Sequence, residues 1–183
     1  MNFLYESDNL YLKVLNDSNA AAVLNFLLHS KESFESFEPA KPSNFYTEKY
    51  QKSLLRLEFK AFLKTNFARF YVYKKDDANT IIGTISFSNI LHAPYDSAFI
   101  GYKFSPDFQG KGYATEAVSL ATYAMFHDGN CHRIQAYVMP DNEPSIKLLK
   151  RIGYECEGLC KEAVNINGKY CDHLLFSIIN SLH

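Results

Sequence analysis

A glycine–lysine–glycine turn between an expected strand and an expected helix constrains the fold of this chain most. The segment PDFQGKGYATEA runs from Pro106 to Ala117 and holds two of the chain's 8 glycines. Glycine uncovers backbone amides and permits positive φ, and a helix begins with free N–H groups at the positive end of its dipole. These features predict an anion site, most often for phosphate. The alternative is a plain strand-to-helix turn, because short glycine motifs also match by accident.

The turn matches neither of the common nucleotide motifs. A phosphate loop needs G-x-x-x-x-G-K-[ST], whereas Gly112 and Tyr113 follow Lys111 here. A dinucleotide fingerprint needs G-x-G-x-x-G, and Thr115 stands where its third glycine belongs. What remains is a glutamine, glycine and alanine pattern, Q-x-x-G-x-A, preceded by a strand and a proline.

Composition narrows the class of protein. A chain of 183 residues that is 47% hydrophobic and 15% aromatic predicts one globular domain over residues 1–183, with room for a sizeable core. A net charge of -1 argues against nucleic-acid binding. No apolar run approaches the roughly eighteen residues that span a bilayer, and the N-terminal residues lack the pattern of a signal peptide. We therefore expect a cytoplasmic protein without a membrane partner.

The four cysteines raise the question of a metal site. Cys156, Cys160 and Cys171, with His173, could be imagined around zinc. No CxxC pair is present, however, and residues four apart on a strand lie about 13 Å from each other. Reduced thiols and no metal are the expectation.

The order of the expected elements indicates a mixed α/β sheet. Hydrophobic periodicity and turn residues predict strands at 10–15, 70–74, 81–88, 97–104, 133–138, 154–164 and 170–179. They predict helices at 20–28, from 47 to about 61, at 114–127 and at 142–152. Residues 31–45 read as irregular, and Asn167-Gly168 as a hairpin turn. Strands followed by strand–helix–strand–helix and a hairpin give a mixed α/β (α+β) sheet.

A second segment, PDNEPSIKLLKRIGY at 140–154, carries a serine in an unusual place. Asp141 or Asn142 can cap the helix, and Pro144 suits its first turn. Spacing of i, i+3, i+4 and i+7 puts four residues on one face: Ser145, Leu148, Leu149 and Ile152. Ser145 therefore points toward the sheet and needs a hydrogen-bond partner. The alternative is a bond back to its own helix.

Together, QGKGYA and NEPSIKLLKRIGY resemble the GNAT superfamily of acetyltransferases, which use acetyl-coenzyme A. The runs IGYKFSPDFQGKGYATEA, RIQAYVMPDNEPSIKLLKRIGYECEG and NINGKYCDH are similar to its ribosomal-protein N-acetyltransferase branch. The likeness covers roughly Ile81 to Ile179. It implies a GNAT-like, mostly antiparallel twisted sheet of about seven strands with about four helices, whose central strands splay at the cofactor site.

The resemblance also implies roles for particular residues. The cofactor pyrophosphate would lie on the backbone of seven residues: Gln109, Gly110, Lys111, Gly112, Tyr113, Ala114 and Thr115. Backbone at Phe104 would pair with the pantetheine arm and face the thioester oxygen, and Asn142 would hold that arm from the other side. Ser145, or a water that it holds, would lie near the sulfur and give the leaving thiolate its proton.

The expected base is where the sequence departs from its relatives. Many members read A-E-I-G-Y before the glycine loop, but Phe99 replaces that glutamate here. Others carry an acid three residues before the N-G turn, where this chain has Val164. The nearest acid is Glu162, two residues back and so expected on the same strand face. The tyrosine that some relatives use as an acid is Leu149 here. Catalytic candidates are thus Ser145 and Glu162, followed by an unranked group: Tyr137, His92, Asp96 and His173.

The acceptor is the least constrained part. The stretch KESFESFE at Lys31–Glu38 places three glutamates where such folds form the acceptor wall, and they could attract a cationic amine or form a solvated helix end. We expect an N-acetyltransferase that moves acetyl from acetyl-coenzyme A to a protein N-terminal amine, such as that of a ribosomal protein. The alternatives are transfer to a small amine (amino acid, polyamine or antibiotic) and a coenzyme A-binding module without catalysis. The sequence leaves monomer and homodimer open.

Overall fold

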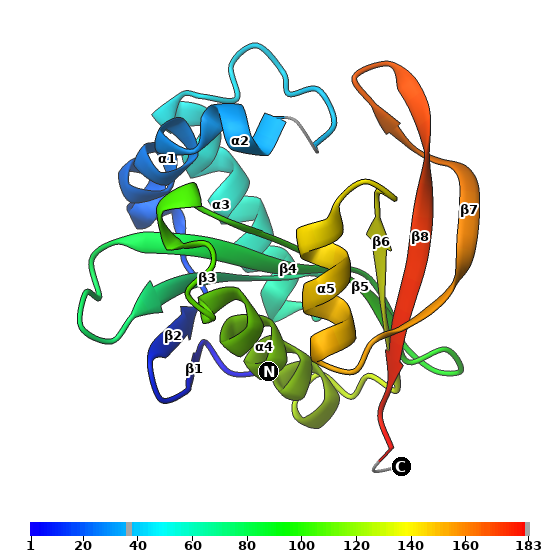
Figure 1. The fold of residues 1–183 in the computed structure, drawn as a ribbon. Coiled ribbons are helices and arrows are strands. Elements are labelled where there is room, and N and C mark those ends of the chain that lie inside the picture. Colours follow the sequence, from blue (N-terminus) through cyan, green and yellow to red (C-terminus); the bar gives the residue numbers. More distant parts are fainter. Residues whose placement is uncertain (36–37, 182–183) are drawn as a thin grey trace.

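The computed structural model describes residues 1–35 and 38–181, which form one sheet of eight strands in the order β1-β2-β3-β4-β5-β6-β8-β7 (Figure 1). The strands are β1 (Leu4–Glu6), β2 (Leu10–Lys13), β3 (Ala68–Lys74), β4 (Ile81–Leu91), β5 (Ser97–Phe104), β6 (Arg133–Val138), β7 (Glu155–Ile166) and β8 (Lys169–Ile179). The α-helices are α1 (Ala20–His29), α2 (Lys31–Glu35), α3 (Glu48–Leu63), α4 (Tyr113–His127) and α5 (Glu143–Arg151). Short 3-10 turns lie at Asp17–Asn19 and Pro106–Phe108.

The predicted mixed, mostly antiparallel sheet is confirmed, with all seven expected strands and all four expected helices. Two short elements were missed. Strand β1 is three residues long and has no buried residue, so it carries no apolar alternation. Helix α2 is five residues long and lies inside the segment expected to be irregular. No helix in residues 1–35 and 38–181 is both long and apolar enough to cross a membrane.

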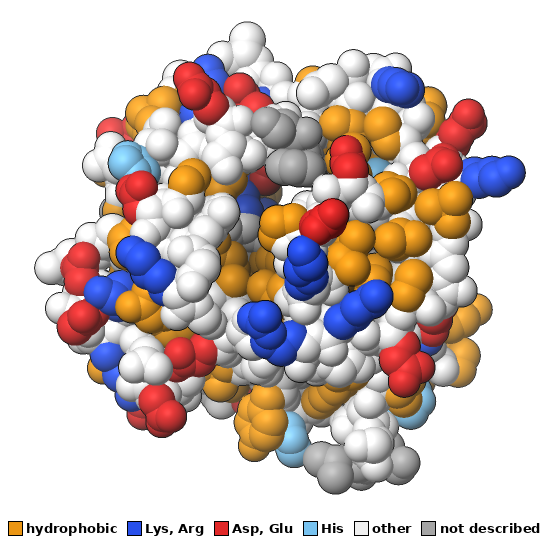
Figure 2. Space-filling view, viewed as in Figure 1, with side chains coloured by type: hydrophobic (Ala, Val, Ile, Leu, Met, Phe, Trp, Pro, Cys, Tyr) orange, Lys and Arg blue, Asp and Glu red, His pale blue; other side chains and the backbone are white. Residues whose placement is uncertain are grey.

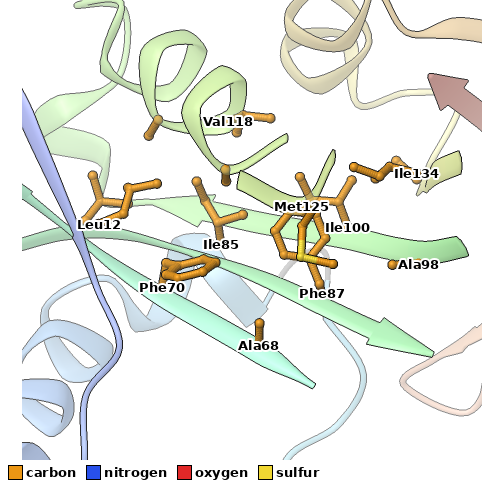
Figure 3. Close-up of a cluster of buried hydrophobic side chains, with 14 of the residues drawn as sticks. Leu12, Ala68, Phe70, Ile85, Phe87, Ala98, Ile100, Val118, Met125 and Ile134 are labelled. Atoms are coloured by element: carbon orange, nitrogen blue, oxygen red, sulfur yellow. The ribbon is translucent and has the colours of Figure 1, made fainter. Parts of the chain in front are cut away.

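Helices cover both faces of the sheet, with α4 and α5 on one face and α1 and α3 on the other (Figure 1). The larger core lies beneath α4, where Val118 and Met125 pack on strand residues such as Ile85 and Phe87 (Figure 3). A second cluster joins Val23 of α1 to the opposite face. Because side chains alternate along a strand, Phe70 enters the first cluster and Tyr71 the second.

The sheet is split between its two central strands, as predicted. Strands β5 and β6 run parallel and pair only from Ser97–Phe99 to Arg133–Gln135. Every other neighbouring pair is antiparallel. Beyond Phe99, therefore, the rest of β5 and the end of β6 are not hydrogen-bonded to each other. This unpaired backbone opens the sheet at the place where the glycine turn and α5 meet.

Candidate active site

The glycine turn presents uncovered backbone donors. Gly110 and Gly112 have φ of 73° and 85°, and a Cβ built on either would meet nothing within 4 Å. Gly112 is the N-cap of α4 and makes no side-chain cap bond. In the described part of the chain, the N–H groups of residues 110–115 donate to no backbone or side-chain acceptor, since the first helical bond comes from Glu116. The loop thus borders an open space and presents unpaired backbone N–H groups to it, at the positive end of a 15-residue helix.

Two side chains of the loop are used to hold its shape. Gln109 donates its Nε2 hydrogen to the Phe104 carbonyl oxygen at 3.1 Å, which ties the loop to the end of β5. Lys111 Nζ donates to the Asp107 carbonyl at 2.8 Å and lies 5.6 Å from the Phe108 ring centre. The Lys111 charge is therefore turned back toward the 3-10 turn.

Helix α5 begins as the sequence predicts and aims its serine at β5. Of the two possible caps, Asn142 is the one used, and its side-chain oxygen accepts from the Ser145 N–H at 3.2 Å. Ser145 Oγ lies 2.6 Å from the Tyr102 hydroxyl oxygen. The partner of Ser145 is therefore a tyrosine across the cleft, and the alternative of a bond back to its own helix is wrong.

The Tyr102 hydroxyl keeps its proton at neutral pH. Burial raises the pKa of Tyr102 to about 12, although the Ser145 hydrogen bond works in the other direction. A phenol that remains protonated can donate to Ser145 Oγ, which leaves the serine's own hydrogen free to point elsewhere. The Tyr102 hydroxyl also donates to the Ser145 carbonyl oxygen at 3.4 Å, so the tyrosine holds both the side chain and the backbone of Ser145 in place.

A cleft of about 780 Å³ joins the glycine turn, the split strands and α5. Figure 2 shows it as a hollow between the α1–α2 side and α5. Eight of the predicted site residues line it: Phe104, Gln109, Gly110, Gly112, Ala114, Thr115, Asn142 and Ser145. Lys111 and Tyr113 do not line it, and Tyr113 instead faces the Lys74 ammonium at 5.9 Å.

Glu162 lies outside this cleft, on an exposed part of β7. The expectation that Glu162 shares a strand face with Val164 is wrong, because a bulge separates them. The register passes from Cys160↔His173 to Val164↔Cys171, so three residues of β7 stand against one of β8. Glu162 has φ 49°, and its N–H binds the Asp172 carboxylate at 2.8 Å. A bulge resets the alternation that the sequence argument relied on.

The four unranked candidates fall into two pairs. His92 and Asp96 lie around the turn between β4 and β5, where His92 contacts Thr65. Tyr137 and His173 line the cleft. The position of the absent glutamate is filled by Phe99, whose ring stacks on Tyr137 with centroids 5.1 Å apart.

Sequence reasoning missed three cleft residues with evident chemical potential. Tyr102 gave no signal because its partner comes from a helix 43 residues away. Lys147 and Arg151 add positive charge to the cleft wall on α5. Their i, i+4 spacing within KLLKR was a usable signal. Residues 1–35 and 38–181 contain no group of three His, Cys, Asp or Glu side chains placed to hold a metal ion.

A smaller cavity of about 290 Å³ opens on the α1 and α3 face of the sheet and shares Gly101, Lys103 and Glu38 with the cleft. Glu38 accepts from Lys103 at 2.7 Å and pairs with Lys41 at 2.8 Å. Burial would raise the pKa of Glu38, but these two ammonium groups hold it below its ordinary value.

The acidic stretch at residues 31–38 is thus partly neutralised within the chain. Besides Glu38, the Glu35 carboxylate accepts from the Tyr46 hydroxyl at 3.0 Å. Phe37 of the same stretch lies outside the described residues. These internal partners leave less negative charge for an acceptor than the sequence pattern suggests.

Comparison with known proteins agrees with this architecture. The family model for the acetyltransferase (GNAT) domain matches residues 9–155. The ribosomal protein uS5-alanine N-acetyltransferase of Escherichia coli is 30% identical over 173 residues, which cover 94% of this chain and 88% of the relative. The crystal structure of the ribosomal-protein-S5-alanine acetyltransferase from Vibrio fischeri superposes with a TM-score of 0.92 at 31% identity, covering 99% of this chain and 98% of that one.

A third comparison includes a bound ligand. Mycobacterium smegmatis RimJ in complex with CoA-disulfide superposes with a TM-score of 0.86 at 26% identity, covering 93% of this chain and 81% of its own. With the family model spanning most of the sequence and a relative aligned along nearly its whole length, this chain belongs to the GNAT family of N-acetyltransferases.

Proposed function

We propose that this enzyme transfers the acetyl group of acetyl-coenzyme A to the N-terminal amine of a protein, of the ribosomal-protein class. The observation that carries the proposal is the row of unpaired N–H groups at residues 110–115, which opens onto a cleft that reaches Ser145. A diphosphate suits this row because its oxygens can accept several backbone donors at a helix start.

The residues around the cleft fit the rest of the cofactor. The unpaired backbone near Phe104 of β5 would hydrogen-bond the pantetheine arm from one side, and Asn142 would hold it from the other. Arg151 on the cleft wall favours a polyanionic ligand, and Lys147 lies on the same wall, paired with Glu143 at 2.7 Å. Bound there, acetyl-coenzyme A supplies an activated thioester.

The transfer requires only modest help from side chains once both reactants are held. The amine nitrogen bonds to the acetyl carbonyl carbon and the carbon–sulfur bond breaks, and holding the reactants together contributes up to about 7–11 kcal/mol. Ser145 donates a proton to the departing sulfur. Tyr102 holds the serine hydroxyl in position, with the two hydroxyl oxygens 2.6 Å apart.

An N-terminal amine is the acceptor class that this site serves most easily. Such an amine has a pKa near 8, so roughly a tenth of it is neutral at pH 7, whereas a lysine near 10.4 is neutral far less often. The two relatives that act on ribosomal proteins, by their names, support the same class. The residue of the acceptor that bears the amine would enter from the side of the smaller cavity, next to Gly101 and Lys103.

The cofactor site is tested with Gly112→Asp. The new carboxylate would lie against the pyrophosphate. Its Cβ would meet nothing within 4 Å, so the cost to the fold is the strain of a side chain at φ 85°. Calorimetry should show at least a hundredfold loss of acetyl-coenzyme A affinity. The matched control is Gly168→Asp, which also replaces a positive-φ glycine in open space but lies in the β7–β8 turn. Unchanged affinity in the Gly112 variant would refute the assignment.

The acceptor class is tested by thiol release with a panel of amines. Turnover with N-terminal peptides of ribosomal proteins, but not with amino acids, polyamines or aminoglycosides, is the expected result. Turnover with small amines alone would show that the acceptor is a small amine and not a protein N-terminus. Tight binding of acetyl-coenzyme A without turnover on any acceptor would mark a binding module, which Phe99 at the usual glutamate position would favour.

A further inference from the structure

The proposed function requires a group that takes a proton from the attacking ammonium, and the cleft offers few such groups. Three side chains that line it in the described part of the chain can accept a proton without first losing one: Glu38, Asp141 and His173. Both oxygens of Glu38 are already taken, by Lys103 and by Lys41. Asp141 is exposed at the start of α5, beside the residue proposed to hold the pantetheine arm.

We propose that His173 of β8 is the general base of the transfer. This inference rests on the proposed function. It commits the amine to one approach, from the face of the sheet opposite to α5.

The position of His173 follows from the strand register. On β8, Phe176 joins the core beneath α4 and α5, so the alternate residue His173 projects from the other face. Tyr137 of β6 is on that same face, and its ring centre lies 6.2 Å from that of His173 in an edge-on arrangement. His173 is 5% exposed yet lines the cleft. It is therefore sheltered from bulk water but open to the reacting groups.

One hydrogen bond determines which ring nitrogen of His173 can accept a proton. His173 Nδ1 lies 3.0 Å from the carbonyl oxygen of Cys171. A carbonyl can only accept, so Nδ1 carries the hydrogen of this bond. In the neutral ring, Nε2 then has a free lone pair. The backbone of β8 thus fixes both the orientation of the imidazole and the tautomer needed for a base.

The acid and the base are separated by the split in the sheet. Ser145 and Tyr102 meet on the α4 and α5 face. His173 and Tyr137 lie on the opposite face, beside the place where β5 and β6 stop pairing at Phe99 and Gln135. A thioester lying in the split would present its sulfur to Ser145 and its carbonyl carbon to an amine arriving beside His173. The ammonium gives one proton to Nε2, directly or through one water, and the nitrogen loses its second proton to water as the amide forms. The departing sulfur takes its proton from Ser145, which regains one from water.

The groups that surround His173 are neutral or paired with an opposite charge. Tyr137 of β6 stays a neutral phenol, because burial and its hydrogen bond with the Cys160 thiol raise its pKa. Cys160 of β7 stands directly opposite His173 in the register, and Cys171 of β8 contributes its carbonyl. Across the cleft, Glu38 and Lys103 neutralise each other.

The test is His173→Gln, assayed as kcat at saturating peptide so that titration of the free amine does not enter. We expect at least a hundredfold loss of kcat at pH 7, with acetyl-coenzyme A affinity unchanged. The acid limb of the unaltered enzyme's pH profile should vanish in the variant. The matched control is His127→Gln, at the last residue of α4, which should behave as the unaltered enzyme.

Several outcomes would overturn the assignment. One is a His173→Gln variant that keeps its kcat and its acid limb, and another is an unaltered enzyme whose kcat shows no acid limb. The second measurement needs no variant, so it holds even if His173→Gln folds poorly. Because cofactor affinity is followed separately, loss of acetyl-coenzyme A binding would count against the proposed function, whereas intact binding with an unmoved pH profile would count against His173 alone.

Discussion

Ser145 and Tyr102 act as a pair, although they come from different elements. The sequence could place Ser145 on the inner face of its helix, because helical spacing is a local property. It could not supply the partner, since the contact depends on how α5 packs over β5. The 2.6 Å separation of the two hydroxyl oxygens makes each group's orientation depend on the other.

This coupling predicts non-additive kinetics. Ser145→Ala should lower kcat about ten- to a hundredfold by removing the proton donor to sulfur. Tyr102→Phe should lower it less, since Ser145 keeps its hydrogen but loses its orientation. If the two act as a unit, the double variant should be no slower than Ser145→Ala. Steady-state kinetics with calorimetric checks of cofactor affinity would measure this, and strictly multiplicative losses would show that the residues act independently.

Helices and strands with strong periodicity were predictable, and those set by neighbours were not. The glycine turn, α4 and α5 follow from local patterns, and so does the hairpin at Asn167-Gly168. Strand β1 exists only because it pairs with β2. The bulge in β7 is likewise invisible in sequence. It places Glu162 outside the cleft lining, because alternation fails where three residues oppose one.

The edge strand β7 is tied to its neighbours by a charged network. Arg133 of β6 donates to both oxygens of Glu157 on β7, and Ser177 of β8 donates to the same carboxylate at 2.6 Å. The Arg133 and Ser177 hydrogen bonds lower the pKa of Glu157 to about 2. The network therefore links three strands through one ionised group.

This network predicts a pH-dependent contribution to stability. A carboxyl whose pKa is lower in the folded chain stabilises it fully above the unfolded value near 4.3, and loses that effect as pH falls toward about 2. Glu157→Gln should be less stable than the unaltered protein at pH 7, by less than about 1 kcal/mol because the group is largely exposed. The difference should disappear near pH 2. Urea unfolding across this range would test it, and a difference independent of pH would contradict it.

Under the proposed function, the split sheet gives the two reactants separate approaches to one reacting centre. Uncovered donors and α5 lie on one face, and His173 and the smaller cavity lie on the other. Because β5 and β6 pair only over three residues, the two approaches meet without any need for one reactant to leave first. An acetylated enzyme intermediate is then unnecessary.

This arrangement predicts sequential kinetics, with both substrates bound before transfer. Initial rates measured against acetyl-coenzyme A at several fixed peptide concentrations should give intersecting double-reciprocal lines. Parallel lines would instead indicate an acetylated enzyme.

The nearest thiol to His173 in the strand register is Cys160, so Cys160→Ser separates the two mechanisms. Retained turnover in that variant is expected. The Cys160 thiol hydrogen-bonds Tyr137 but does not itself line the cleft, so it takes no part in a direct transfer. Abolished turnover, together with parallel lines, would replace direct attack by transfer through Cys160.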